Sequence, residues 1–485
     1  MTAVELQLSK ALAAAFPPYN QATAVTTIRS IGGDKHTMPD VTKHADALSG
    51  QSYSATKLAP EDEWIGKLDL YAFRDEIKAL GKELAAQQGP ADLAHLNKIV
   101  WWSRLSQWVG ALTMWYSINP VSIFLLSVGC MTRWTCIGHH VCHGGYDKLD
   151  ESKRYNRFTF GVGTVYRRAT DWLDWMLVEA WNCEHNQLHH YYLGEEEDPD
   201  LVEENLRLMR ETPAPRAVKV AVSCLMMTIW KWWYYAPNTF KVFKQNQLRR
   251  AGKPLPSHPT MAGSKWASTI NPDWLTIGPI FYTASEFFVR VLGPFFLARF
   301  VLLPAAFGLL LGRAAFYNSL VTLIAAELLT NAHAFLNIVT NHAGDDLYRF
   351  EGHCSPRSGT YFLRQVISSV NFRTGTPYTT LGDVNDFLHG WLNYQIEHHL
   401  WPDLSMLSYQ KAAPLVRALC AKHGVPYVQQ NVFWRLKKTI DIMTGHNSMR
   451  RFPSAFEKQA DLTEGRAEAT VHDQFKDAYP VGAKS

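Results

Sequence analysis

The pattern of hydrophobic and polar positions changes twice along the chain. Residues 1–95 are polar, with one helical pattern near 65–87. Long apolar runs then alternate with polar stretches up to about residue 440, and the end of the chain is polar again. We therefore predict a polar cytosolic N-terminal segment (1–95), a membrane domain (96–440) and a polar C-terminal tail (441–485).

Two pairs of apolar runs predict transmembrane hairpins. The first pair lies within residues 105–140 and turns at Asn119-Pro120, a dipeptide that favours turns. Its two runs are near the lower length limit for a bilayer crossing. The second pair lies within residues 291–339 and turns at Gly312-Arg313. The expected fold is an all-α integral membrane protein with two transmembrane hairpins, about four crossings, and a cytosolic helical cap.

A third apolar stretch, residues 217–237, is interrupted by Lys219 and Lys231 and fits either a crossing or an interfacial helix. The distribution of cations decides between them. Basic residues gather at 148–168 and 241–253, whereas the two hairpin turns carry almost none. The positive-inside rule places both basic stretches on the cytosolic side, together with both termini. The third apolar stretch is then predicted to lie on the membrane.

Composition agrees with a membrane protein that has a large aqueous part. Of 485 residues, 47% are hydrophobic and 19% are charged, below the roughly 25% of soluble domains. Seventeen tryptophans suit membrane interfaces, while a mean hydropathy of −0.16 keeps much of the chain in water. A net charge of +4 gives no reason to expect a nucleic-acid partner. The seven cysteines lack paired spacing and are interpreted as reduced thiols.

Histidines cluster where the predicted hairpins end. The clusters are GHHVCHGG with His139, His140 and His143, WNCEHNQLHHYY with His185, His189 and His190, and QIEHH with His398 and His399, while TNHAGDD adds His342. A single histidine beside an apolar run is more often a hydrogen-bonded core residue than a ligand. Three clusters on one predicted side of the membrane are hard to assign to chance, so we interpret them as metal ligands.

The spacing of these histidines predicts how they share metals. Residues four apart on a helix lie on one face, so His139 and His143 are predicted to converge on one metal. The same argument pairs His185 with His189. Adjacent residues diverge by about 100° on a helix, so His189 and His190 serve either two metals or one metal and a neighbouring contact. The adjacent pair in the third cluster is interpreted in the same way.

The number of imidazoles indicates two metals. The candidate ligands are His139, His143, His185, His189, His190, His342, His398 and His399. One tetrahedral zinc uses four ligands at most, and two neighbouring metals in an imidazole shell suit iron. The Glu-x-x-His repeat of soluble di-iron bundles is absent from the sequence.

Other residues are weaker candidates. Possible ligands or partners of ligands are Gln395, His333, Asn337, His389, Asp198 and Asp200. Either aspartate can accept the second N–H of a ligand histidine, or the acidic run EEEDPD is only a solvated loop. His333 and Asn337 are ligands or helix-packing residues. His140 is expected to face away from its neighbours. The isolated histidines are predicted to be surface residues: His353, His423, His446 and His472.

The ordered clusters HHVCH, HNQLHH and QIEHH resemble the three histidine boxes of membrane fatty acid desaturases and related hydroxylases. The resemblance covers roughly residues 96–440, and in that family the boxes follow the two hairpins in the arrangement predicted here. The form Gln395-x-x-His398-His399 resembles acyl-lipid and front-end desaturases, whereas many other members carry histidine in place of Gln395.

The resemblance implies a multi-pass enzyme of the endoplasmic reticulum, a plastid or a bacterial inner membrane, with the boxes in the cytosolic cap. It implies two iron ions (Fe2+/Fe3+), molecular oxygen as co-substrate, and an acyl lipid or acyl-CoA as substrate. Many front-end relatives carry a fused cytochrome b5 domain with an HPGG motif, which residues 1–95 lack. The electron donor is therefore expected to be a separate protein of the cytochrome b5 or ferredoxin type.

A group of cations on the predicted cytosolic side fits such a donor. These are Arg154, Arg157, Arg167, Lys241, Lys244, Arg249 and Arg250. They either steer an acidic protein towards the membrane surface or only anchor anionic lipid head groups.

Two other functions compete with desaturation. A hydroxylase or carotenoid ketolase would use the same boxes, and only its product would differ. A bis-histidine haem protein or a metal transporter needs histidines inside the bilayer, whereas the clusters lie beside polar loops at the helix ends.

Overall fold

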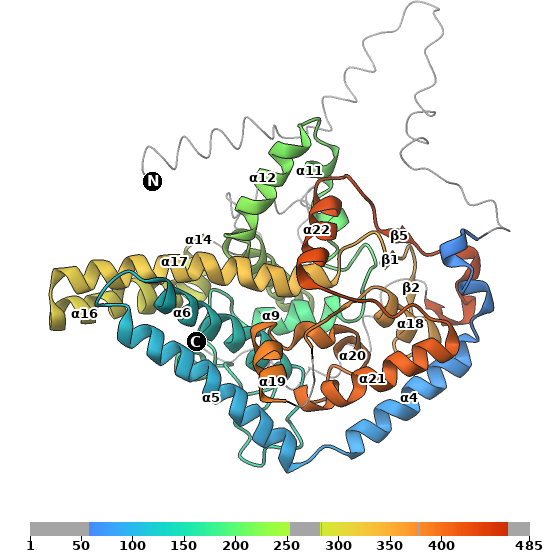
Figure 1. The fold of residues 1–485 in the computed structure, drawn as a ribbon, viewed down its shortest axis with the longest axis horizontal. Coiled ribbons are helices and arrows are strands. Elements are labelled where there is room, and N and C mark those ends of the chain that lie inside the picture. The colour runs from blue at the N-terminus through green and yellow to red at the C-terminus, as the bar shows by residue number, and fades with distance from the viewer. Residues whose placement is uncertain (1–57, 253–281, 283, 376–378, 464–485) are drawn as a thin grey trace, which may run out of the picture.

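The computed structural model describes residues 58–252, 282, 284–375 and 379–463. In this part of the chain an arm of long helices extends from a cap of shorter helices (Figure 1). The arm is formed by α5 (Pro90–Thr113), α6 (Pro120–Thr132), α16 (Leu303–Leu311) and α17 (Arg313–Ile338). Helix α5 packs on α6, α6 on α17, and α17 on α16.

Both predicted hairpin turns are present. The side-chain oxygen of Asn119 caps α6 by accepting the N–H of Ser122 at 2.8 Å. Gly312 has a φ of 93°, which glycine adopts without a steric penalty, and it reverses the chain between α16 and α17.

Two of the arm helices extend beyond their α-helical parts. After α6 the chain continues as the π-helix η3 (Arg133–Gly138) into α7 (His139–Cys142). Ahead of α16 lie α14 (Ala284–Phe287), η8 (Phe288–Leu292), α15 (Gly293–Phe296) and η9 (Leu297–Leu302).

Three of the described helices are long and apolar enough to cross a membrane: Pro120–Cys142, Ser285–Leu311 and Arg313–Asn341. In Ser285–Leu311 only 11% of the apolar window is buried by the protein. Helix α5 is not among the three, although Trp101 and Trp108 are exposed along it. The predicted four crossings are therefore not confirmed. The described residues of 217–237 also form no candidate crossing.

The cap contains the remaining elements. Its helices are α4 (Leu70–Ala86), α8 (Val165–Asp171), α9 (Val178–Glu184), α10 (Val202–Asn205), α11 (Arg207–Glu211), α12 (Arg216–Met227), α13 (Ala236–Arg250), α18 (Gly359–Ile367), α19 (Thr380–Leu388), α20 (Gln395–Leu400), α21 (Met406–His423) and α22 (Val432–Met443). Short π segments are η4 (His185–His189) and η5 (Lys231–Tyr235), and the 3-10 turns are η1 (Pro60–Asp62), η2 (Ile65–Lys67), η10 (Val339–Asn341), η11 (Leu392–Tyr394), η12 (Ser454–Phe456) and η13 (Gln459–Asp461).

Six two-residue strands tie distant segments of the cap together. Parallel pairs join β1 (Tyr348–Arg349) to β5 (Arg450–Arg451) and β3 (Asn371–Phe372) to β4 (Gln429–Gln430). An antiparallel pair joins β2 (His353–Cys354) to β6 (Leu462–Thr463).

The helical pattern predicted near 65–87 is confirmed as α4. Asp69 caps this helix by accepting the N–H of Ala72 at 3.0 Å. Phe73, Ile77 and Leu84 are buried on one face, which packs against α18 and α21. The predicted domain boundaries at residues 95 and 440 fall inside α5 and α22.

Buried charges join the cap to the arm. The Nζ of Lys231 lies 2.9 Å from Asp174 and 3.1 Å from Glu327 of α17. Arg299 lies 3.3 Å from the other oxygen of the same glutamate. Two cations thus face two acids, as buried charges require, and Lys231 is part of the protein interior.

Several of the cations that were predicted to steer an acidic electron donor form ion pairs with carboxylates in the structure. The ion pairs are Arg154–Asp171 (3.3 Å), Arg167–Asp171 (3.3 Å), Arg157–Asp147 and Lys244–Glu286 (2.9 Å). These pairs reduce the net positive field expected from the sequence.

Candidate metal centre

The first histidine cluster lies where the α6 helix enters the cap. The π-helix η3 leads directly into α7, and the N–H of His143 donates to the carbonyl of His139 at 3.1 Å. The two side chains therefore lie one turn apart on the same face, as their spacing predicts, with ring centroids 5.1 Å apart.

The second cluster lies on a π turn, which the sequence analysis did not foresee. The N–H of His190 donates to the carbonyl of His185 at 3.3 Å, five residues back. A π turn brings residues five apart onto one face. His185 consequently shares its group with His190, and His189 joins the other group. The predicted pairing of His185 with His189 remains possible as a third grouping, because their rings stack with centroids 5.1 Å apart and Asp200 lies close to both.

The third cluster forms the short helix α20. The side chain of Asn371, in β3, holds its start by accepting the N–H of Ile396 at 2.9 Å. The adjacent His398 and His399 point to different groups, as expected from their divergence on a helix.

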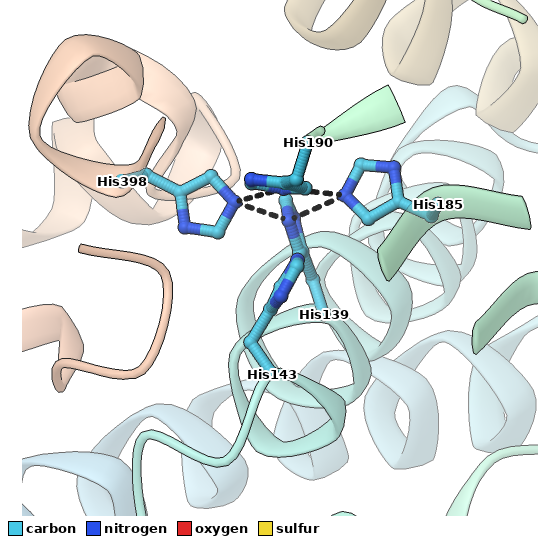
Figure 2. A group of neighbouring side chains, drawn as sticks. All are labelled: His139, His143, His185, His190 and His398. Carbon is cyan, nitrogen blue, oxygen red and sulfur yellow. Dashed lines mark hydrogen bonds between the residues drawn. The ribbon is translucent and has the colours of Figure 1, made fainter. Parts of the chain in front are cut away.

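The first group gathers five buried histidines (Figure 2). They are His139, His143, His185, His190 and His398, and one ring nitrogen of each lies within 4.8 Å of the others. Four Nε2 atoms form a closed ring with distances of 2.8 Å (His139–His398), 3.1 Å (His139–His185), 3.3 Å (His185–His190) and 3.2 Å (His190–His398). Nitrogens bound about 2.0–2.2 Å from one ion lie about 3 Å apart, so the ring has the dimensions of a coordination shell.

The protonation of these rings also fits a cation. Burial, followed by the neighbouring histidines, holds the pKa values of His190 and His398 well below the usual range. The imidazoles are therefore neutral, with one N–H and one lone pair each. The Nε2 of His143 is buried and has no hydrogen-bond partner. A cation among these atoms would bind lone pairs that the protein itself leaves unsatisfied.

The second group is formed by His189, His342 and His399. The side-chain amide of Gln395 lies between two of them, 3.0 Å from the Nε2 of His342 and 3.2 Å from that of His399. The Oε1 of Gln395 is buried without a partner. Since the amide nitrogen and oxygen exchange places by a flip, Gln395 can present its oxygen to the same centre.

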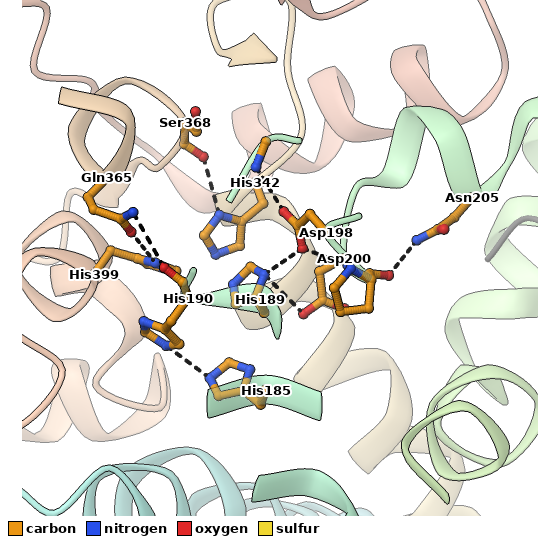
Figure 3. A network of polar contacts seen from close by, with 12 residues as sticks. His185, His189, His190, Asp198, Asp200, Asn205, His342, Gln365, Ser368 and His399 are labelled. Carbon is orange, nitrogen blue, oxygen red and sulfur yellow. Dashed lines mark hydrogen bonds and ion pairs between the residues drawn. The ribbon is translucent and has the colours of Figure 1, made fainter. Parts of the chain in front are cut away.

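Hydrogen bonds on the outer side orient the second group (Figure 3). The Nδ1 atoms contact Asp198 (from His189, 2.8 Å), the carbonyl of Ser368 (from His342, 3.2 Å) and the Oε1 of Gln365 (from His399, 3.2 Å). Asp200 lies 3.6 Å from the same nitrogen of His189. Burial lowers the pKa of His189, but the carboxylates of Asp198 and Asp200 together outweigh it and raise the pKa. Such acceptors fix the tautomer that leaves Nε2 free for a metal.

The two groups adjoin each other. The ring of His190 stacks on that of His399, with centroids 4.3 Å apart and planes inclined by 20°. His189 and His190 are neighbours in the chain yet belong to different groups. The arrangement can hold two metal ions side by side, with eight imidazoles facing them.

Three of the weaker candidates lie outside these groups. His333 and Asn337 donate to the carbonyl of Leu388 at 2.8 and 3.2 Å. His389 donates to the carbonyl of Asn385 at 2.9 Å. The side chains of His333 and Asn337 connect α17 to α19, and none of the three residues belongs to a group of described residues that can hold a metal.

Two histidines predicted to be surface residues are packed instead. His353 lies 2.6 Å from Glu195, and the side chain of His423 is 9% exposed and contacts the ring of Phe73. The partners are distant in sequence, which hides these contacts from a sequence pattern. His446 is exposed as predicted, and His472 lies outside the described residues.

His140 makes a hydrogen bond to the carbonyl of Cys136 at 2.8 Å and belongs to neither group. Gln365, Ser368 and Tyr409, whose hydroxyl lies 3.3 Å from the Nδ1 of His398, were missed by the sequence analysis. They belong to no motif, because a hydrogen bond to the outer nitrogen requires no particular residue type.

An apolar cavity of about 70 Å³ opens beside the second group. Its wall contains His342 and Asp200 on the side of the histidines, and Phe335, Trp230, Met226 and Met443 elsewhere. The wall therefore includes Phe335 of α17 and His342, which directly follows the turn η10.

The chain resembles known proteins in sequence, and the matches come from one family. A sequence profile of the family described as fatty acid desaturase matches residues 113–431. The chain is 25% identical over 352 residues to the NADPH-dependent stearoyl-CoA 9-desaturase of Mycobacterium tuberculosis, which covers 68% of this chain and 67% of that protein. It is 52% identical over 48 residues to the mouse fatty acid desaturase 2-like protein FADS2B and 57% identical over 42 residues to bovine fatty acid desaturase 3. Each of these two matches spans 10% of the mammalian protein. No solved structure matches the chain.

Proposed function

Because this chain belongs to the fatty acid desaturase family, we propose that it is a membrane-bound di-iron desaturase. It introduces a double bond into an acyl chain, using O2 and two electrons from a separate donor protein. The two adjoining groups of buried imidazoles are the observation that carries the proposal.

In this proposal each group holds one iron. The first is held by His139, His143, His185, His190 and His398, and the second by His189, His342, His399 and the side chain of Gln395. When bound, the irons supply the oxidising chemistry that removes two hydrogens from adjacent carbons. The reaction reduces O2 to two water molecules. Two electrons come from the donor, two protons from solvent and two hydrogens from the acyl chain, which is left with a new carbon–carbon double bond.

The protein's own contribution is orientation and exclusion of water. Asp198 holds the ring of His189, and Gln365 holds that of His399, so that neither imidazole turns away. The apolar cavity beside His342 can receive a methylene chain and contains few polar groups that would bind water. A chain placed there would present its carbons to the second group.

The orientation in the membrane follows from charge. We propose that the cap and the termini lie on the cytosolic side, because basic residues gather in the cap whereas the hairpin turns carry almost none. The electron donor, of cytochrome b5 or ferredoxin type, would then approach the cap from the cytosol.

The proposal is tested by expression in a host of known lipid composition, followed by mass spectrometry of fatty acid methyl esters. We expect a new unsaturated fatty acid that is absent with the His399→Ala variant. A hydroxylated or keto product would instead identify an oxygenase on the same scaffold. An unchanged lipid profile, with the protein inserted and loaded with metal, would contradict the proposal.

A further inference from the structure

Beyond its first residue, Arg216, helix α12 (Arg216–Met227) turns Lys219 and Ser223 inwards. Lys219 is 9% exposed and Ser223 is fully buried. The Nζ of Lys219 donates to the carbonyl of Arg210 at 2.6 Å and to that of Thr444 at 3.4 Å. Ser223 donates to the carbonyl of Lys219 at 2.9 Å. The only cation in the middle of the helix is therefore satisfied by the protein.

The outward face of the same helix is apolar. Val218 and Leu225 are each 51% exposed, and Ala217, Ala221 and Cys224 are exposed with them. Their spacing of three, four and seven residues places them on one side of the helix. A water-facing helix has the opposite arrangement, so the medium outside α12 is expected to be apolar.

A second helix in contact with α12 also carries exposed aromatic residues. Phe433 and Trp434 of α22 are 67% and 51% exposed, and α22 contacts α12. The Nζ of Lys437 lies 5.2 Å from the ring centroid of Trp434. A tryptophan beside a lysine is typical of the boundary between acyl chains and head groups.

The face also adjoins the lipid-facing surface of the arm. Helices α12 and α22 both contact α17, a candidate crossing, at its cap end (Figure 1). Just after α12, the indole N–H of Trp230 donates to the carbonyl of Asn331 in α17 at 2.8 Å. These contacts fix α12 across the end of the arm, where the membrane surface would lie.

Helix α12 forms part of the cavity wall as well. Met226 lines the apolar cavity that reaches His342, together with Trp230 and Tyr234 of the segment that follows. Its neighbour Leu225 faces outwards. One turn of this helix therefore separates the outer medium from the space beside the second histidine group.

We propose that α12 lies in the membrane interface, with its outward face in lipid, and that acyl chains enter the cavity from the bilayer past this helix. The substrate class is then an acyl chain carried by a membrane lipid, and not a thioester dissolved in the cytosol. The substrate part of this inference rests on the proposed function, whereas the position of α12 does not.

Cys224 makes the position of α12 directly measurable. It is the only fully exposed cysteine of the seven, all of which are described. A nitroxide on Cys224 of the full chain in lipid nanodiscs should be reached by O2 and shielded from a water-soluble nickel chelate. The control is Lys82→Cys in a Cys224→Ser background, because Lys82 is exposed on α4 of the cap. The control label should show the reverse preference. Free access of nickel to Cys224, or spin–spin broadening from a second copy, would overturn the inference.

The entry route is tested with a variant that places a larger side chain in the cavity wall and so narrows the cavity. Met226→Trp should lower conversion of phospholipid-borne acyl chains on the order of tenfold or more, with metal content unchanged. Leu208→Trp, at an exposed position on α11 that does not line the cavity, should leave conversion unchanged. Faster conversion of a soluble acyl-CoA than of the same chain in phospholipid would overturn lipid-side entry. Conversion of neither substrate would contradict the proposed function, and the Cys224 measurement would still decide where α12 lies.

Discussion

The Nε2 atoms of His139 and His398 lie 2.8 Å apart, although 259 positions separate these residues in the chain. His139 lies at the end of the first hairpin and His398 follows the second hairpin. Their contact therefore joins the segments that follow the two hairpins. The facing nitrogens of two neutral imidazoles can share one N–H, whereas a cation between them would bind both lone pairs. A metal bound by the histidine groups would therefore couple its binding to the stability of the fold.

Removal of metal should lower thermal stability. An ion that binds only the folded chain stabilises it by mass action, and its loss leaves buried lone pairs unpaired. We expect chelation to lower the unfolding temperature in detergent by several degrees and Fe2+ to restore it. The His446→Ala variant should respond like the unsubstituted protein, because His446 is exposed. An unfolding temperature that does not change when the metal has been removed, as verified by metal analysis, would contradict this coupling.

Substitution of a histidine in either group should abolish turnover. His185→Ala affects the first group, and His189→Ala and His399→Ala affect the second. Each variant should still insert in the membrane, because the helices that cross it are unaltered. Fatty acid profiling of cells that express each variant gives the measurement, and His446→Ala serves as the control. His423 is unsuitable for that purpose because it packs against Phe73. An equal loss of turnover in the His446→Ala variant would contradict a specific role for the two histidine groups.

Asp198→Asn should weaken the second metal selectively. The carboxylate accepts the Nδ1–H of His189 at 2.8 Å, and loss of such a partner lowers metal affinity about 10–100-fold. The asparagine keeps a similar size and an oxygen acceptor, so the fold should persist. Metal titration of the purified variant, against Asp403→Asn at an exposed position, checks the effect. Unchanged affinity would mean that Asp198 only shapes its loop.

Lys231→Met should destabilise the protein strongly. It removes one partner of a buried network and leaves Asp174 and Glu327 short of a cation, which costs about 3–5 kcal/mol. Lys437→Met removes a pair with Asp441 whose lysine side chain is 56% exposed, so less than about 1 kcal/mol is expected. Thermal unfolding of the two variants in the same detergent compares them. Similar losses from both would contradict the role of burial.

The sequence was most informative where one residue type decides the geometry. The turn at Gly312 and the divergence of His398 from His399 follow from glycine's conformational freedom and from helix geometry. The pairing of His185 with His190 could not be predicted, because the π turn depends on the surrounding packing. The partial burial of His353 and His423 could not be predicted for a related reason, since both partners come from distant segments.

The membrane arm shows the same limit. The three apolar helices are evident from hydropathy. Helix α5 combines polar residues with exposed tryptophans and is not among the candidate membrane crossings. The number of crossings therefore stays a prediction. Lys219 and Lys231 looked like interruptions of an apolar stretch, and the structure shows that both are satisfied inside the protein.

Metal analysis of the purified chain tests the central claim most directly. Iron and zinc are measured per chain by mass spectrometry, together with protein concentration from amino-acid analysis. The account predicts two irons per chain, and a loss of iron in the His189→Ala variant but not in His446→Ala. One zinc and no iron per chain would contradict it.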